Sequence, residues 1–160
     1  MANYINIISN QSFEIDVNQI NQKYNFNLPK LKFSKVCDYS DCYNLNGNNN
    51  YNRLDQFAYS KGLHIFADKD LSQILYIGDD FEQNFKTRLQ QHFIDKDTGG
   101  LRYKFKNDPS KLKLLEDSTI YVCPLPDVNK NDLNEMREKL KRPAATSSAS
   151  AARRSRPRPR

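Results

Sequence analysis

Short apolar runs separated by polar turns cover most of the chain, and the most ordered part of this pattern lies at residues 62–93. Two runs, GLHIF at 62–66 and ILYIG at 74–78, flank the polar stretch ADKD at 67–70. β-Branched and aromatic residues on both sides of a turn with Asp and Lys predict a β-hairpin. An apolar residue then recurs at every fourth position, which predicts one buried face of a helix. The members of this stripe are Phe81, Phe85, Leu89 and Phe93.

The N-terminal sixty residues carry weaker patterns of the same two kinds. Residues 4–8, YINII, predict a strand. Residues 16–24 have apolar side chains at helical spacing, so we expect a helix with Asp16 as its N-cap. Residues 28–33 alternate apolar and basic side chains and are interpreted as an extended piece at a sheet edge. Residues 52–61 predict a short helix or an irregular lead-in to the hairpin.

Beyond the hairpin and its helix, the patterns predict one strand and one further helix. Residues 119–123, TIYVC, predict a strand that ends at a proline. A helix is expected from Asn131 or Asp132 to Leu140. Residues 101–106 alternate apolar or aromatic with cationic side chains. As a strand this segment would place three cations on one face, and as a helix it would spread them, so both structures remain open.

These elements predict an α+β fold with a small antiparallel sheet of about three core strands, flanked by helices. A chain of 160 residues allows one domain with a substantial core. We expect an N-terminal extension at residues 1–60, a core at 61–142 and a separate tail at 143–160. The extension is interpreted either as an element that selects the substrate or as a packing layer for the core.

The tail differs in composition from the rest of the chain, since residues 143–160 contain only Pro, Ala, Thr, Ser and Arg. Such a segment has no apolar surface to bury, so we expect it to be disordered. Its arginines, together with Lys141 and Arg142, resemble a two-part nuclear import signal. The abrupt change in composition equally suits a fused end or a shifted reading frame. The first interpretation predicts a nuclear protein and the second a cytoplasmic one.

Charge and composition narrow the class of protein. The net charge is +6, but the tail alone carries five arginines, which leaves +1 for residues 1–142. A nucleic-acid surface would therefore depend on an uneven distribution of charge. No apolar run approaches the ~20 residues of a membrane span, so no membrane partner is expected. The N-terminus lacks the pattern of a signal peptide. Three cysteines, an odd number, favour a reducing compartment.

The hairpin and its helix carry four side chains with useful chemistry: His64, Tyr76, Arg88 and His92. Arg88 and His92 are four residues apart, so both project from one side of the predicted helix. The ordered set Gly62-Leu63-His64, Tyr76-Ile77-Gly78 and Arg88-x-x-x-His92 spans thirty-one residues and resembles the GIY-YIG nucleases. Tyr76-Ile77-Gly78 matches the second motif in full, whereas His64 stands where the family has its first tyrosine.

The resemblance implies a metal-dependent endonuclease that hydrolyses phosphodiester bonds in DNA, such as a small restriction or defence enzyme. It also implies that one carboxylate on the helix after the last strand binds Mg²⁺ or Mn²⁺. Glu135 is the candidate for this metal ligand, and Glu138 is the alternative. Mg²⁺ keeps several waters and accepts one or two carboxylates, so a single Glu is sufficient. The asparagine that the family carries shortly after this glutamate has no counterpart here.

Each of the other four residues is assigned a role in this hypothesis. Arg88 would clamp the phosphate with two hydrogen bonds and stabilise the developing negative charge. Tyr76 would position the attacking water or donate to a phosphate oxygen. His64 would accept the proton of the water, a role that suits an imidazole near neutral pH. His92 would orient or assist.

Double-stranded DNA is the expected partner, and a homodimer would let a one-site nuclease cut both strands. Cations outside the catalytic set are expected to contact the DNA backbone, although runs of charge also form ordinary solvated faces. Two further hypotheses stay open: an inactive nucleic-acid-binding member of the same fold, and an unrelated α+β interaction module. The predicted DNA contacts are Lys30, Lys32, Lys69, Lys86, Arg102, Lys104 and Lys106.

Overall fold

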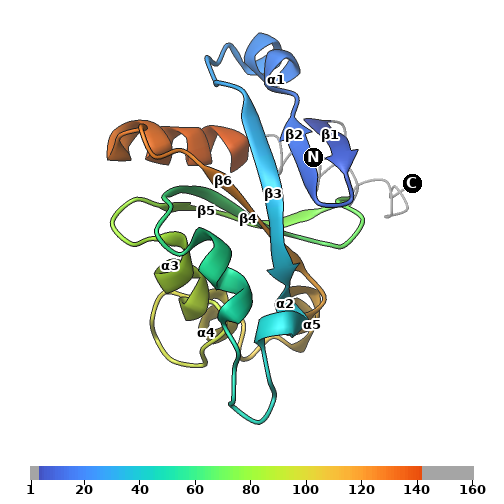
Figure 1. Cartoon of the computed structure of the whole chain (residues 1–160). Helices are drawn as coiled ribbons and strands as arrows, with labels where there is room; N and C mark the ends of the chain where they lie inside the picture. Colours follow the sequence, from blue (N-terminus) through green and yellow to red (C-terminus); the bar gives the residue numbers. More distant parts are fainter. Residues whose placement is uncertain (1–3, 142–160) are drawn as a thin grey trace, which may run out of the picture.

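The computed structural model describes residues 4–141, and a six-stranded antiparallel sheet runs through them in the order β1-β2-β3-β6-β4-β5 (Figure 1). The strands are β1 Ile5–Ser9, β2 Ser12–Ile15, β3 Leu31–Asp38, β4 Gly62–Ala67, β5 Ile74–Asp80 and β6 Thr119–Pro124. The helices are α1 Val17–Tyr24, α2 Tyr39–Cys42, the 3₁₀ helix η2 Asn52–Phe57, α3 Phe85–Gln91, α4 Leu101–Lys104, α5 Pro109–Glu116, and a C-terminal helix at residues 130–141.

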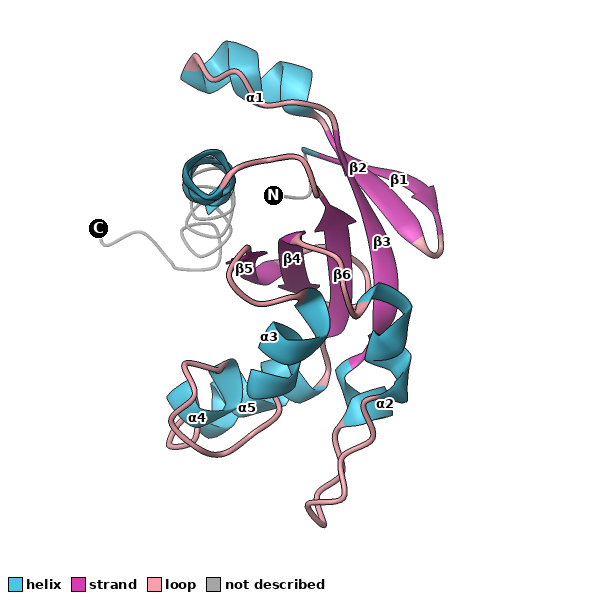
Figure 2. Ribbon diagram, turned by 60° about the vertical axis from the view of Figure 1, so that its left-hand side comes forward, coloured by secondary structure: helices cyan, strands magenta, loops and turns pink. Residues whose placement is uncertain are grey.

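Helices cover both faces of the sheet, as Figure 2 shows. The C-terminal helix and α1 pack on one face, where Ile20 and Leu133 join a core with the strand residues Leu63 and Ile65. The short helices α2 to α5 cover the other face, where Phe85 joins a second core with Phe66, Val122 and other strand residues. The interior strand β4 is therefore buried along its whole length, which explains its nearly continuous apolar sequence.

The predicted hairpin is confirmed as β4 and β5, and its register fixes which residues face one another. His64 lies opposite Gly78, and Phe66 lies opposite Tyr76. Because side chains alternate between faces along a strand, these residues share the face covered by α3. The polar turn is closed by Asp68, whose side chain accepts from the backbone N–H of Gln73.

The sheet is larger than the prediction of about three core strands. The three C-terminal strands form the expected unit, but β3 pairs with β6 on one side and with β2 on the other. The three strands of residues 5–38 therefore extend the same sheet instead of forming a separate layer. The prediction of an edge piece at residues 28–33 is wrong, because the strand begins at Leu31 and lies inside the sheet.

Several local predictions are confirmed. The Asp16 side chain accepts from the N–H of Gln19 and caps α1. The open question at residues 101–106 is resolved in favour of a helix, so its cations are spread over different directions. The last helix begins slightly earlier than predicted, and Asn129 accepts from the N–H of Asp132. No helix within residues 4–141 is long and apolar enough to cross a membrane. The predicted disordered tail lies outside the described residues.

Candidate functional site

Three of the predicted residues form one ring cluster against the face of β4 and β5. The ring centroids of His64 and Tyr76 lie 5.6 Å apart, those of His64 and His92 5.3 Å, and those of Tyr76 and His92 5.2 Å. His64 comes from β4, Tyr76 from β5, and His92 from the C-terminal end of α3. The hairpin and the following helix therefore bring together side chains that are up to 28 residues apart in the sequence.

Gly78, the last residue of the YIG motif, makes room for this cluster. A Cβ atom at position 78 would lie 2.4 Å from Cε1 and 2.5 Å from Nε2 of His64, and 2.9 Å from Cε1 of Tyr76. Such distances are far inside van der Waals contact, so any larger residue would displace the imidazole. The glycine of this motif thus has a steric role, which makes room for His64 on the facing strand and for Tyr76.

His64 is held by a carboxylate that the sequence analysis missed. Nδ1 of His64 lies 2.5 Å from Oδ2 of Asp80, and both side chains are fully buried. Burial raises the pKa of Asp80, while the charges of His64 and Arg88 oppose this shift. With Nδ1–H donating to the carboxylate, Nε2 of His64 is left as the acceptor. Asp80 follows Gly78 by two positions on the same strand face, and this alternation is the signal that could have identified it.

The second imidazole has the opposite tautomer. Nδ1 of His92 accepts from the backbone N–H of Leu101 at 3.0 Å, so Nε2 carries the hydrogen. Burial lowers the pKa of His92 well below its usual range, and the charges of His64 and Arg88 lower it further. Tyr39 supports this residue from α2, because its hydroxyl donates to the His92 carbonyl at 2.8 Å. His92 is therefore neutral and offers Nε2–H as a donor, whereas the neighbouring His64 offers Nε2 as an acceptor.

Three buried polar atoms of the cluster have no hydrogen-bond partner among the described residues: Nε2 of His64, Nε2 of His92 and Oδ1 of Asp80. A buried donor or acceptor without a partner costs about 1–3 kcal/mol. Such groups are rare in native proteins and call for a specific explanation. The cluster therefore holds one free buried donor, Nε2–H of His92, and one free buried acceptor, Nε2 of His64.

Arg88 lies at the edge of the cluster and is partly exposed. Its guanidinium donates to Oε1 of Gln91 at 2.6 Å and to the carbonyl of Gly99 at 3.2 Å. Among residues 4–141 it forms no ion pair with a carboxylate. Arg88 also lines a pocket of about 360 Å³ between the end of β5 and the C-terminal helix, together with Asp80 and Arg137. An arginine without an anionic partner is suited to bind a phosphate.

The structure does not bring Glu135 to this cluster. Its helix packs on the opposite face of the sheet, and its carboxylate forms an ion pair with Lys139 at 2.8 Å with 60% of the side chain exposed. The alternative, Glu138, pairs with Arg137 and Lys141. Within the described part of the chain, no group of three or more His, Cys, Asp or Glu side chains is placed to hold a metal ion.

The predicted DNA-contacting cations do not form one surface. Lys30 precedes β3 and pairs with Glu14, and Lys32 lies on β3, which β6 and β4 separate from β5. Lys86 lies on α3, the helix that leads to His92, and pairs with Asp55 on η2. Lys69 lies in the hairpin turn.

The three cationic side chains of residues 101–106 also lie in different environments. Arg102 is largely enclosed, because its guanidinium stacks 3.7 Å from the Tyr43 ring centroid and pairs with Glu116. Lys106 lies over the Tyr103 ring. Lys104 lines a groove beside β5. Of this set, Lys104 lines a cavity near the ring cluster.

No protein-family model, curated protein or solved structure matches the chain. The resemblance to the GIY-YIG nucleases therefore rests on the motif residues alone.

Proposed function

We propose that the chain is a nuclease that hydrolyses phosphodiester bonds in DNA, with His64, Tyr76, Arg88 and His92 at its active site and Asp80 as the partner of His64. The observation that supports this most is the pair of imidazoles. One is oriented by a buried carboxylate and keeps a free acceptor, and the other keeps a free donor. Acid–base hydrolysis needs a base that is oriented in this way.

Each of these residues has a separate role in the proposed reaction. A water that accepts from Nε2–H of His92 and donates to Nε2 of His64 is positioned to attack phosphorus. His64 takes the proton as the new P–O bond forms, and Asp80 stabilises the imidazolium. The bond from phosphorus to the leaving oxygen breaks, and that oxygen takes a proton from solvent. Arg88 neutralises charge on the phosphate, and the Tyr76 hydroxyl donates to one of its oxygens.

Access to the cluster limits where a substrate can enter. His64 and His92 are completely buried, whereas Tyr76 and Arg88 are partly exposed. A phosphate would therefore approach between the phenol and the guanidinium. Arg88 would exchange its hydrogen bonds to Gln91 and Gly99 for bonds to the phosphate. These two bonds are to neutral acceptors, which a charged phosphate oxygen outcompetes.

The residues present do not fit the metal site that the resemblance implies. Glu135 lies on the other face, and the ring cluster offers one carboxylate, Asp80, with one unpartnered oxygen. The neighbouring Asp79 pairs with Arg137, since successive side chains of a strand point to opposite faces. The steps assigned to these residues therefore involve no metal, and dependence on Mg²⁺ or Mn²⁺ through Glu135 is a proposal that the cleavage experiment tests.

One observation favours a second candidate function. The complete burial of both imidazoles would suit a catalytically inactive protein that binds nucleic acid and keeps the cluster for packing. Cleavage and binding assays on the same protein separate the two candidates.

Cleavage of supercoiled plasmid tests the proposal, with Mg²⁺, Mn²⁺ or EDTA present. We expect His64→Ala and Arg88→Ala to abolish cleavage, with Lys113→Ala, a change on a distant part of α5, as the control. Cleavage that survives both active-site substitutions would remove the proposed site. If EDTA abolishes cleavage and the Glu135→Ala substitution abolishes it as well, Glu135 would be the metal ligand that the resemblance implies. Binding without cleavage in the unaltered chain would favour the second candidate. The same assay shows whether one or both DNA strands are cut. Cutting of both strands is what the proposed restriction or defence role and the proposed homodimer require.

A further inference from the structure

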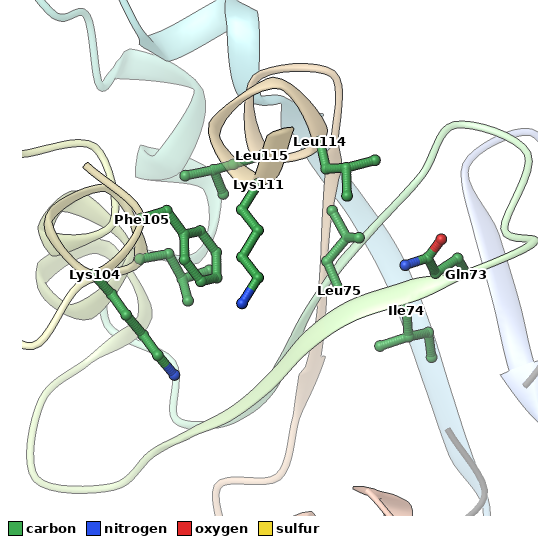
Figure 3. Close-up of a pocket in the computed structure, with 9 residues that line it drawn as sticks. Gln73, Ile74, Leu75, Lys104, Phe105, Lys111, Leu114 and Leu115 are labelled. Atoms are coloured by element: carbon green, nitrogen blue, oxygen red, sulfur yellow. The ribbon is translucent and has the colours of Figure 1, made fainter. Parts of the chain in front are cut away.

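A second cavity lies on the face of the sheet that carries the ring cluster. A groove of about 310 Å³ runs between the edge strand β5 and the helices α4 and α5. Figure 3 shows Leu75 and Leu114 on one side and Phe105 on the other, with Lys104 and Lys111 extending alongside the phenyl ring. The walls are thus apolar and aromatic, and the charged groups are both cationic.

The two lysines of this groove are not neutralised. Nζ of Lys104 lies 5.9 Å from the Phe105 ring centroid, and Nζ of Lys111 lies 5.4 Å from it. Within the described residues neither ammonium has a carboxylate at ion-pair distance. By contrast, Lys113 on the same helix pairs with Asp117 at 3.2 Å. The groove therefore combines an aromatic surface with an uncompensated positive charge.

The groove is connected directly to the ring cluster. Leu101 lines it, and the backbone N–H of the same residue donates to Nδ1 of His92. Leu75 lines it as well, and the next residue on β5 is Tyr76. The groove and the ring cluster therefore share Leu101 and adjoin each other along β5.

We propose that this groove binds one unpaired nucleotide of a nucleic-acid strand, with its base against Phe105 and the leucines and its phosphate between Lys104 and Lys111. Proteins bind single strands by this combination of aromatic stacking and a cationic track for the backbone. The inference rests on the proposed nuclease function, and it narrows the substrate to a strand with a nucleotide outside the duplex, such as a flap, a frayed end or a single strand. A duplex base would have to leave its stack to enter.

The test measures binding of a short single-stranded oligonucleotide that contains one 2-aminopurine, whose fluorescence changes when the base stacks. All proteins carry Arg88→Ala, so that cleavage does not interfere. We expect a change in fluorescence on binding, and a loss of affinity of about five-fold or more for Lys111→Ala. Lys113→Ala is the matched control, because it removes the same charge from the same helix outside the groove, and it should bind like its parent. Leu114→Asp, at a position that is 44% exposed, should also weaken binding.

Three results would overturn the inference: equal affinity of the Lys111→Ala and Lys113→Ala proteins, binding with no change in 2-aminopurine fluorescence, or equal affinity for a blunt duplex. Displacement of the oligonucleotide by an acidic apolar peptide at lower concentration than by a mononucleotide would assign the groove to a peptide instead. Failure here is distinct from failure of the proposed function. Plasmid cleavage by the unaltered chain tests the ring cluster, and the binding measurement requires no cleavage.

Discussion

Nδ1 of His64 lies 2.5 Å from Oδ2 of Asp80, and neither side chain is exposed to solvent. A buried pair of this kind orients the imidazole and fixes which nitrogen is free. His64 stands where the GIY-YIG motif has its first tyrosine. Asp80 gives this histidine a hydrogen-bond partner at that position.

Asp80→Asn tests this relationship. The substitution keeps the size of the side chain but removes the charge that stabilises a protonated His64. We expect cleavage to fall by about 10²-fold or more, because the base His64 loses the carboxylate that orients it and stabilises its protonated form. Asp79→Asn is the matched control, as the adjacent carboxylate faces the other side and pairs with Arg137. Equal losses in the two variants would show that Asp80 has no particular role.

Gly78→Ala should destabilise the fold through a clash with His64. The new methyl group would lie only 2.4 Å from Cε1 and 2.5 Å from Nε2 of the imidazole. We expect a loss of about 1–3 kcal/mol in the free energy of unfolding, measured with denaturant. In the His64→Ala background the same substitution should cost clearly less, because the obstructing ring is gone. An additive double variant would contradict the steric role of the motif glycine.

Stability should fall as the pH is lowered, because His92 is buried in its neutral form. Its pKa is lower in the folded chain than in the unfolded one, so below about pH 6.5 the unfolded state binds more protons. Between pH 7.5 and 5 this lowers the free energy of unfolding by at most about 2 kcal/mol. The contribution of Asp80 to the pH dependence of stability has the opposite sign. Because its pKa is raised in the folded state, protonated Asp80 stabilises the fold at low pH, and this stabilisation is lost as the pH rises through the raised pKa.

Denaturant unfolding of the unaltered chain and of His92→Gln at these two pH values isolates the histidine contribution. The difference between pH 7.5 and pH 5 should be smaller in the variant, in which residue 92 cannot titrate. An unchanged difference would show that His92 is already accessible to protons in the folded state.

The sequence was sufficient for the elements that local patterns define and insufficient where distant segments meet. The hairpin, α1 and the strand at residues 119–123 follow from alternation, spacing and caps, and all three are confirmed. The six-stranded sheet was missed because it depends on pairing between β3 and β6, more than 80 residues apart, as for Asp38 and Thr119. No local pattern encodes such a contact.

The candidate site divides in the same way. His64, Tyr76 and His92 meet because one hairpin and the next helix carry them, so short-range patterns place them correctly. Glu135 was assigned to the site from its position in the order of elements alone. Which face of the sheet its helix covers depends on Leu133 and Leu140, whose packing against β4 turns the glutamate towards solvent.

Arg88→Lys separates the geometry of the guanidinium from its charge. Lysine keeps the positive charge but cannot form two parallel hydrogen bonds to a phosphate. If Arg88 stabilises the transition state through its fork, cleavage by Arg88→Lys should fall by about 10²-fold or more, nearly as far as in Arg88→Ala. The free energy of unfolding should change little, because the side chain is partly exposed and its partners are the neutral Gln91 and Gly99. Lys113→Arg on α5 is the control, and full activity of Arg88→Lys would reduce the role of this residue to charge alone.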